Sequence, residues 1–110
     1  MFTVLLADDE PIIRRGVKKL VDWESLGYQI IGETGDGLST LEFILKNKPQ
    51  LVLLDIKMPE IDGLEVMKRA REAGFGGKVI ILSGYSDFTY AQEALRYNVT
   101  SYLSKPVESD

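Results

Sequence analysis

Short apolar runs alternate along the chain with stretches that have helical spacing. The clearest runs, each of strand length, are residues 2–7, 51–54, 78–82 and, more weakly, 100–103. A fifth run at residues 28–33 is half polar, as an edge strand would be, whereas the middle runs are typical of strands buried on both faces. The pattern therefore predicts five strands.

Four helices are predicted between these strands. Pro11 is well placed in the first turn of the first helix. Asp62 and Glu65 resemble a capping box ahead of the third helix, and the fourth helix starts near Ser86 or Asp87. The apolar positions that mark the four helices are Ile13, Val17, Leu20 and Val21; Leu38, Leu41, Ile44 and Leu45; Leu64, Met67 and Ala70; and Phe88, Ala91, Ala94 and Leu95.

The alternation of strands and helices predicts one doubly wound α/β domain over residues 1–110. Right-handed crossovers give a parallel five-stranded sheet with helices on both faces. The chain stops seven residues after Leu103, which is too soon for a fifth helix. We therefore expect one undercovered flank, so that either the natural protein continues or a partner fills that place, with a homodimer as one form of self-association.

Composition then narrows the function classes. Hydrophobic residues make up 45% and charged residues 27% of the chain, which is ordinary for a globular domain. The chain has no Cys and no His, which excludes thiol catalysis, disulfides, Ser-His-Asp catalysis and nearly every zinc site. The net charge of -4 is a poor match for nucleic acid, so we expect no direct DNA contact by this domain.

The sequence also bears on location. No apolar run approaches the roughly 18 residues that span a bilayer. The N-terminus turns acidic where a signal peptide would continue apolar. We therefore expect a cytoplasmic protein without a membrane segment.

Polar residues follow four of the five predicted strands. The first strand is followed by Asp8 and Asp9, the third by Asp55, the fourth by Ser83 and the fifth by Lys105. Because parallel strands end at one edge of the sheet, where ligands bind in such folds, these side chains are expected to converge. Crowded carboxylates repel one another unless a cation offsets their charge.

A hard divalent cation suits this set of side chains. With oxygen ligands only, Mg²⁺ or Mn²⁺ fits better than zinc or copper, and Mg²⁺ commonly completes its shell with phosphate oxygens. An Asp carboxylate can itself act as a nucleophile and hold an aspartyl-phosphate. Asp55 ends the central strand and is the candidate acceptor, with Asp8 and Asp9 as the metal carboxylates.

Four segments resemble a known family in their order and spacing. They are LLADDE, LLDIKMP with Asp-Gly after it, ILSGYSD and YLSKP. Together they resemble the receiver domain of two-component response regulators over nearly the whole chain. The resemblance implies the flavodoxin-like strand order 2-1-3-4-5, without the last helix of the family.

The resemblance also implies a role for each matching residue near the metal. Asp55 would be the phosphoacceptor and, with Asp9 and the backbone carbonyl of Lys57, a metal ligand. Asp8 would be a ligand through water. The domain would catalyse its own phosphoryl transfer and its dephosphorylation.

Further roles fall on the last two strands. Lys105 and Ser83 would contact the phosphoryl oxygens, and Tyr102 would be the aromatic switch residue that turns inward as Ser83 moves toward the phosphate. Pro106 matches the usual cis proline of the family.

Two bulky residues flank the predicted site. Lys57 follows Asp55 by two residues, and Tyr85 follows Ser83 by two. Their bulk is expected to hinder a hydrolytic water, so that phosphate is lost slowly.

The stretches VDWESLGY and SGYSDFTYAQEAL resemble receivers of regulators that end in an arabinose-regulator-type helix-turn-helix. This subfamily implies a DNA-binding region beyond residue 110 of the parent protein and a sensor histidine kinase as the phosphoryl donor.

Other interpretations stay open. A small Mg²⁺-dependent phosphatase would use the same acids, a flavodoxin-like module would share the strand order, and a receiver-like module could act by interaction alone without phosphorylation. A basic turn in the first helix is interpreted as a solvated helix face; it consists of Arg14, Arg15, Lys18 and Lys19.

Overall fold

The structure, a computed structural model, describes residues 1–83, 92 and 100–104. The described elements, in chain order, are β1 (Phe2–Ala7), α1 (Pro11–Leu20), β2 (Tyr28–Thr34), α2 (Gly37–Asn47), β3 (Leu51–Asp55), α3 (Gly63–Glu72), β4 (Lys78–Ser83) and β5 (Ser101–Ser104). All five predicted strands and the first three predicted helices are present. The fourth predicted helix lies outside the described residues except at Gln92, which is helical.

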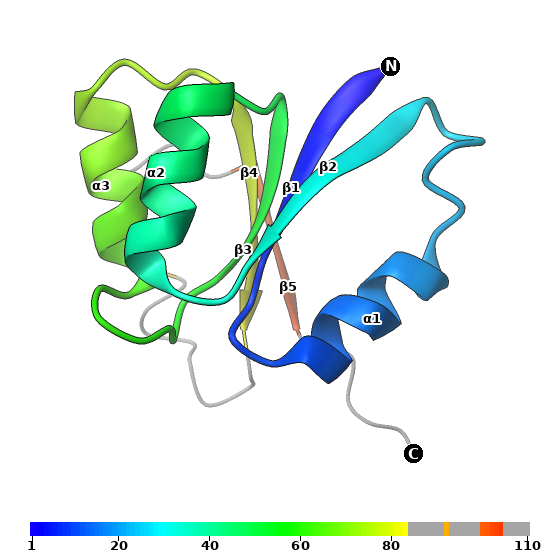
Figure 1. Cartoon of the computed structure of the whole chain (residues 1–110), viewed down its shortest axis with the longest axis horizontal. Helices are drawn as coiled ribbons and strands as arrows, with labels where there is room; N and C mark the ends of the chain where they lie inside the picture. The colour runs from blue at the N-terminus through cyan, green and yellow to red at the C-terminus, as the bar shows by residue number, and fades with distance from the viewer. Residues whose placement is uncertain (84–91, 93–99, 105–110) are drawn as a thin grey trace.

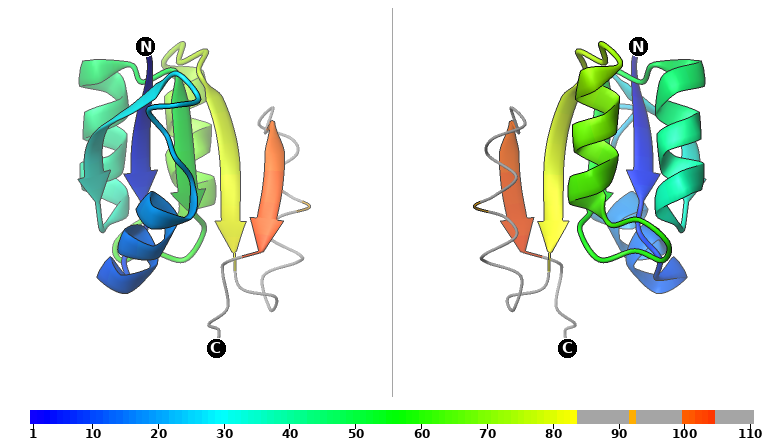
Figure 2. Two further views of the ribbon diagram at one scale, coloured as in Figure 1. Left: turned by 90° about the vertical axis from the view of Figure 1, so that its right-hand side faces the viewer. Right: turned by 90° about the vertical axis from the view of Figure 1, so that its left-hand side faces the viewer.

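The five strands form one parallel sheet in the order β2-β1-β3-β4-β5, as expected. Figure 2 shows that all five arrowheads point to the same end of the molecule. The central strand β3 is buried along its whole length, whereas β2 alternates between half-buried and exposed residues. This difference matches the positions of β2 at an edge and β3 in the middle.

Helices cover both faces of the sheet. In Figure 1, α1 lies on one face, and α2 and α3 lie side by side on the other. Each face has its own apolar core. Val4 and Leu6 of β1 pack on the α1 side with Val17, while Leu5 and Ala7 pack on the side of α2 and α3. Successive side chains of a strand point to opposite faces, so β1 contributes to both cores.

Side-chain caps begin two of the helices at the carboxyl edge of the sheet. The Asp62 carboxylate accepts the backbone N–H of Glu65 at 2.9 Å, which is one of the two hydrogen bonds of the predicted capping box, while the Glu65 carboxylate pairs with Arg69. Asp36 accepts the N–H of Ser39 at 2.7 Å at the start of α2, and this bond lowers the pKa of Asp36. In the part of the chain that the structure describes, no helix is long and apolar enough to cross a bilayer.

Candidate functional site

Three carboxylates meet where β1 and β3 end. Asp8 and Asp9 follow β1, and Asp55 is the last residue of β3. The register pairs Ala7 with Leu54, which places the residues that follow them side by side. One carboxylate oxygen from each of the three residues lies within 4.8 Å of the others. The acidic cluster predicted from the strand ends is therefore present.

The three acids of this cluster differ in exposure. Asp8 is 1% exposed and Asp55 is 0% exposed, whereas Asp9 is exposed. A charged group in the protein interior needs an opposite charge or several hydrogen bonds. A hard cation at the cluster would find three carboxylates as oxygen ligands, which is the donor chemistry that Mg²⁺ and Mn²⁺ prefer. The donor set therefore fits such a metal ion.

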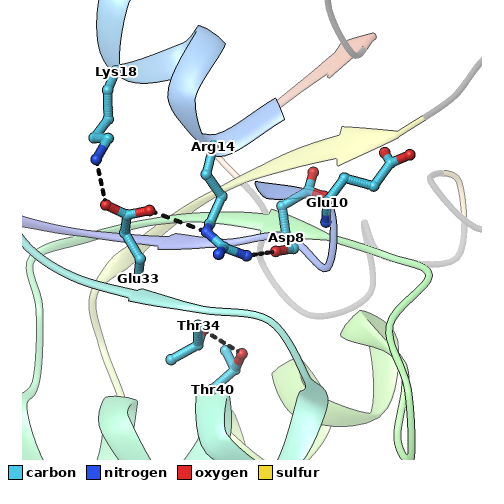
Figure 3. Close-up of polar contacts among 7 residues, drawn as sticks. All are labelled: Asp8, Glu10, Arg14, Lys18, Glu33, Thr34 and Thr40. Atoms are coloured by element: carbon cyan, nitrogen blue, oxygen red, sulfur yellow. Dashed lines mark hydrogen bonds and ion pairs between the residues drawn. The ribbon is translucent and has the colours of Figure 1, made fainter. Parts of the chain in front are cut away.

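The loop between β1 and α1 is held by several hydrogen bonds. The backbone N–H of Asp8 donates to the carbonyl of Thr34 at 3.0 Å, and the N–H of Glu10 donates to the Asp8 carboxylate at 2.9 Å. The guanidinium of Arg14 donates to the backbone carbonyl of Asp8, as Figure 3 shows. The loop thus has a defined shape immediately beside the acidic cluster.

The loop between β3 and α3 approaches the same cluster from the other side. The N–H of Gly63 donates to the carbonyl of Ile56 at 2.6 Å. A Cβ at position 63 would lie 2.3 Å from the Asp55 carbonyl oxygen, which is far inside van der Waals contact. Only glycine lets the start of α3 pack this closely against Asp55. In the sequence Gly63 is recognisable only as part of the Asp-Gly motif, and its packing role is visible only in three dimensions.

Other predicted residues are placed by backbone register alone. Asp55 pairs with Leu82, so Ser83 follows at the same edge of the sheet and pairs with Ser104. Tyr102 pairs with Ile81 inside the sheet. The side chains of Ser83 and Tyr102 lie outside what the structure describes.

Three predictions concern residues that are not described at all. Tyr85, Lys105 and Pro106 lie outside the described residues. Lys57, at the other proposed access position, is exposed and lies two residues after Asp55.

The interpretation of the basic turn as a solvated face is wrong only for Arg14, which is half-buried; Lys18 is exposed and pairs with Glu33 at the surface. Arg14 Nε donates to Glu33 Oε1 at 3.0 Å, and Lys18 Nζ donates to Glu33 Oε2 at 2.6 Å. The Lys18 ammonium, with Arg14, holds the pKa of Glu33 below its usual value. Arg15 and Lys19 are exposed, as predicted. The one sequence signal for this network is the four-residue spacing of Arg14 and Lys18, which puts both on one side of the helix.

A cavity of about 610 Å³ lies at the opposite, amino-terminal edge of the sheet. Its lining includes Phe2, Leu45 and Phe75 but none of the three clustered acids. The cavity is therefore separate from the acidic site.

Comparison with known proteins agrees with this fold and site. A family model for the response regulator receiver domain matches residues 4–110. YesN, an uncharacterized transcriptional regulatory protein of Bacillus subtilis strain 168, is 43% identical over 106 residues, which are 96% of this chain and 29% of YesN. The chain thus spans less than a third of that relative.

Two solved structures are also similar. The REC domain of AraT, a response regulator from Geobacillus stearothermophilus, superposes with a TM-score of 0.90 at 41% identity, covering 97% of this chain and 83% of that one. A two component transcriptional regulator AraC from Clostridium phytofermentans ISDg gives a TM-score of 0.84 at 30% identity, covering 98% of this chain and 84% of that one. The chain therefore belongs to the response regulator receiver domain family.

Proposed function

We propose that this domain takes a phosphoryl group onto Asp55 from the phosphohistidine of a sensor histidine kinase. The observation that supports the proposal is the meeting of three carboxylates at the carboxyl edge, with Asp55 buried at the end of the central strand. A carboxylate oxygen of Asp55 attacks phosphorus, and the bond from phosphorus to the donor nitrogen breaks. The second ring nitrogen of the phosphohistidine carries a proton in this step, so the donor leaves as neutral imidazole. The histidine lies outside these 110 residues, which contain none.

The metal site that we propose consists of the Asp8, Asp9 and Asp55 carboxylates and the backbone carbonyl of Lys57. A bound Mg²⁺ or Mn²⁺ would offset negative charge on the transferring group. The chain's own contribution is to hold the three acids within 4.8 Å of one another at a fixed strand register.

The remaining roles fall on residues at the ends of β4 and β5. We propose that Ser83 and Lys105 bind phosphoryl oxygens and that Ser83 and Tyr102 form the switch. Asp55 and Ser83 end neighbouring strands, which supports a shared site. A phosphoryl group bound by Ser83 would bias a two-state element at this edge of the sheet.

We propose that the switch controls a DNA-binding region of the arabinose-regulator type in the parent protein. Two observations support this output. The similar Clostridium phytofermentans protein is named a two component transcriptional regulator AraC, and YesN, a transcriptional regulatory protein, is much longer than this chain. A second copy of the domain is a further proposed partner.

Intact mass spectrometry tests the phosphoacceptor. Acetyl phosphate with Mg²⁺ should add one phosphoryl group to the wild type, and EDTA or Asp55→Asn should abolish the addition. Asp22→Asn is the matched control, because Asp22 lies in an exposed turn away from the cluster and should be modified normally. A wild type that stays unmodified would overturn the proposal. Steady hydrolysis of a generic phosphate ester without a covalent adduct would instead favour the phosphatase.

Replacing Lys57 tests the control of phosphate lifetime. Lys57→Ala should shorten the aspartyl-phosphate lifetime by about threefold to tenfold, a barrier change of up to about 1.4 kcal/mol, because it removes bulk beside the path of the attacking water. Decay would be followed by mass after removal of the donor, with Lys46→Ala on the exposed side of α2 as control. We expect the same direction for Tyr85→Ala. An unchanged lifetime in both variants would rule out shielding by these side chains.

A further inference from the structure

We infer that Arg14 is a positioning residue for the metal-binding loop, and that Glu33 holds its guanidinium in the required orientation. The inference rests on the proposed function, because it concerns the same acidic site. It assigns a role to two residues that touch neither the metal nor the phosphoryl group.

The hydrogen-bond ladder between β1 and β2 ends at Asp8. The N–H of Asp8 still bonds to β2, through the Thr34 carbonyl at 3.0 Å. Beyond that point β1 leaves the sheet so that Asp8 and Asp9 can reach the site. The Asp8 carbonyl instead accepts the guanidinium of Arg14. Because Asp8 is almost fully buried, this donor also satisfies a carbonyl that would otherwise be costly to bury.

This hydrogen bond bears directly on the metal ligands. The Asp8 carbonyl belongs to the peptide plane that joins Asp8 to Asp9, and a peptide unit is rigid. Holding the oxygen therefore restricts the orientation of that plane and, with it, the position of the Asp9 Cα. Asp9 is also held from the residue that follows it, because the Glu10 N–H donates to the Asp8 carboxylate at 2.9 Å.

The Arg14 guanidinium is itself oriented by an ion pair with Glu33. Its Nε donates to Glu33 Oε1 at 3.0 Å, and the second oxygen of Glu33 accepts Lys18 Nζ at 2.6 Å. Figure 3 shows the Arg14 head group lying between Glu33 and Asp8. The fork of an arginine can bridge two acceptors in fixed directions, whereas a lysine ammonium is a point donor on a flexible stem.

Gly35 lies beside the Arg14 guanidinium, at a distance where a side-chain Cβ would make ordinary van der Waals contact. A Cβ on Gly35 would lie 3.4 Å from Arg14 Nη1 and 3.8 Å from the Asp8 carbonyl oxygen. The Arg14 side chain is 20% exposed, so it is packed between α1, β2 and the loop. Its positive charge by itself would disfavour a cation nearby, and the Glu33 carboxylate offsets that charge.

The test compares Mg²⁺ affinity by isothermal titration calorimetry at fixed ionic strength. Arg14→Lys keeps the charge but loses the fork, and should weaken Mg²⁺ binding by roughly tenfold, the lower end of the effect expected for groups that orient metal ligands. Glu33→Gln keeps the shape of the side chain but removes its charge, and should weaken Mg²⁺ binding by about threefold. The matched control is Arg69→Lys, because Arg69 Nε pairs with Glu65 on α3 at 2.7 Å, on the opposite face of the sheet.

A second measurement separates positioning from general stability. In the metal-free protein, hydrogen exchange of the Glu10 amide should accelerate in Arg14→Lys, while the amides of β3 stay protected. If Arg14→Lys does not fold, the Glu33→Gln titration decides. Mg²⁺ affinity unchanged in the folded variants, with normal phosphorylation of the wild type, would overturn this inference and leave the proposed function intact. Failure of the wild type itself to bind Mg²⁺ would contradict the proposed function instead.

Discussion

Replacing Asp9 by Asn is expected to stabilise the metal-free domain while it weakens Mg²⁺ binding by about 100-fold, or about 2.7 kcal/mol. Without a cation, three carboxylates within 4.8 Å repel one another. Since Asp9 is exposed, each repulsion is worth only about 1 kcal/mol. Removing the Asp9 charge removes two such repulsions and should raise the melting temperature by about 8–13 °C. The same change removes a proposed metal ligand.

This prediction is specific because the stability of the metal-free domain should rise while its Mg²⁺ affinity falls. Thermal melts in EDTA and calorimetric Mg²⁺ titrations would be run on the wild type, Asp9→Asn and the remote control Asp22→Asn. The control should leave the Mg²⁺ affinity unchanged and should not raise the melting temperature, because Asp22 lies in an exposed turn where its carboxylate accepts hydrogen bonds from Ser25. A lower melting temperature for Asp9→Asn in EDTA would mean that repulsion is not the dominant interaction at this edge.

A large loss of stability is expected for Gly63→Ala. The added Cβ would lie 2.3 Å from the Asp55 carbonyl oxygen and 2.9 Å from the Ile56 Cα, so backbone must move on both sides of the contact. We expect a loss of about 3 kcal/mol, which corresponds to roughly 12–20 °C in melting temperature. Because the contact involves Asp55 itself, phosphorylation should also slow in the fraction that stays folded.

Gly16→Ala is the matched control for this substitution. Gly16 lies inside α1 and is exposed, and a Cβ added there would have nothing within 4 Å. Alanine is the better helix former at such a position, so the domain should gain about 0.5–1 kcal/mol of stability. Urea unfolding of both variants measures the difference. Equal stability of Gly63→Ala and the wild type would show that the start of α3 can move away from β3 at little cost.

Much of the fold was predictable because it depends on local pattern. The continuous apolar run at residues 51–54 predicts a strand buried on both faces, and β3 is buried throughout. The half-polar run at 28–33 predicts an edge strand, and β2 pairs only with β1 among the described strands. Several strands continue one residue past the predicted run, as β3 does to Asp55, because ladder hydrogen bonds do not require an apolar side chain.

The partner of the basic turn in α1 could not be predicted from the sequence pattern. Helical spacing shows that Arg14 and Lys18 share one side of the helix, but it does not show what that side faces. Their partner, Glu33, belongs to a strand that follows later in the chain and that the sequence predicts only as an edge element. Contacts between a helix and an edge strand depend on how the two pack, so sequence spacing could not identify them.

The residues at the ends of the strands could be assigned from the chain alone, because strand length and polarity are local properties. Asp8, Asp9 and Asp55 were therefore expected at one edge of a parallel sheet. The approach of their carboxylates within 4.8 Å, and the burial of two of them, follow from three-dimensional packing. They depend on strand register, because the pairing of Ala7 with Leu54 and the close contact of Gly63 with Asp55 join segments that are distant in the chain.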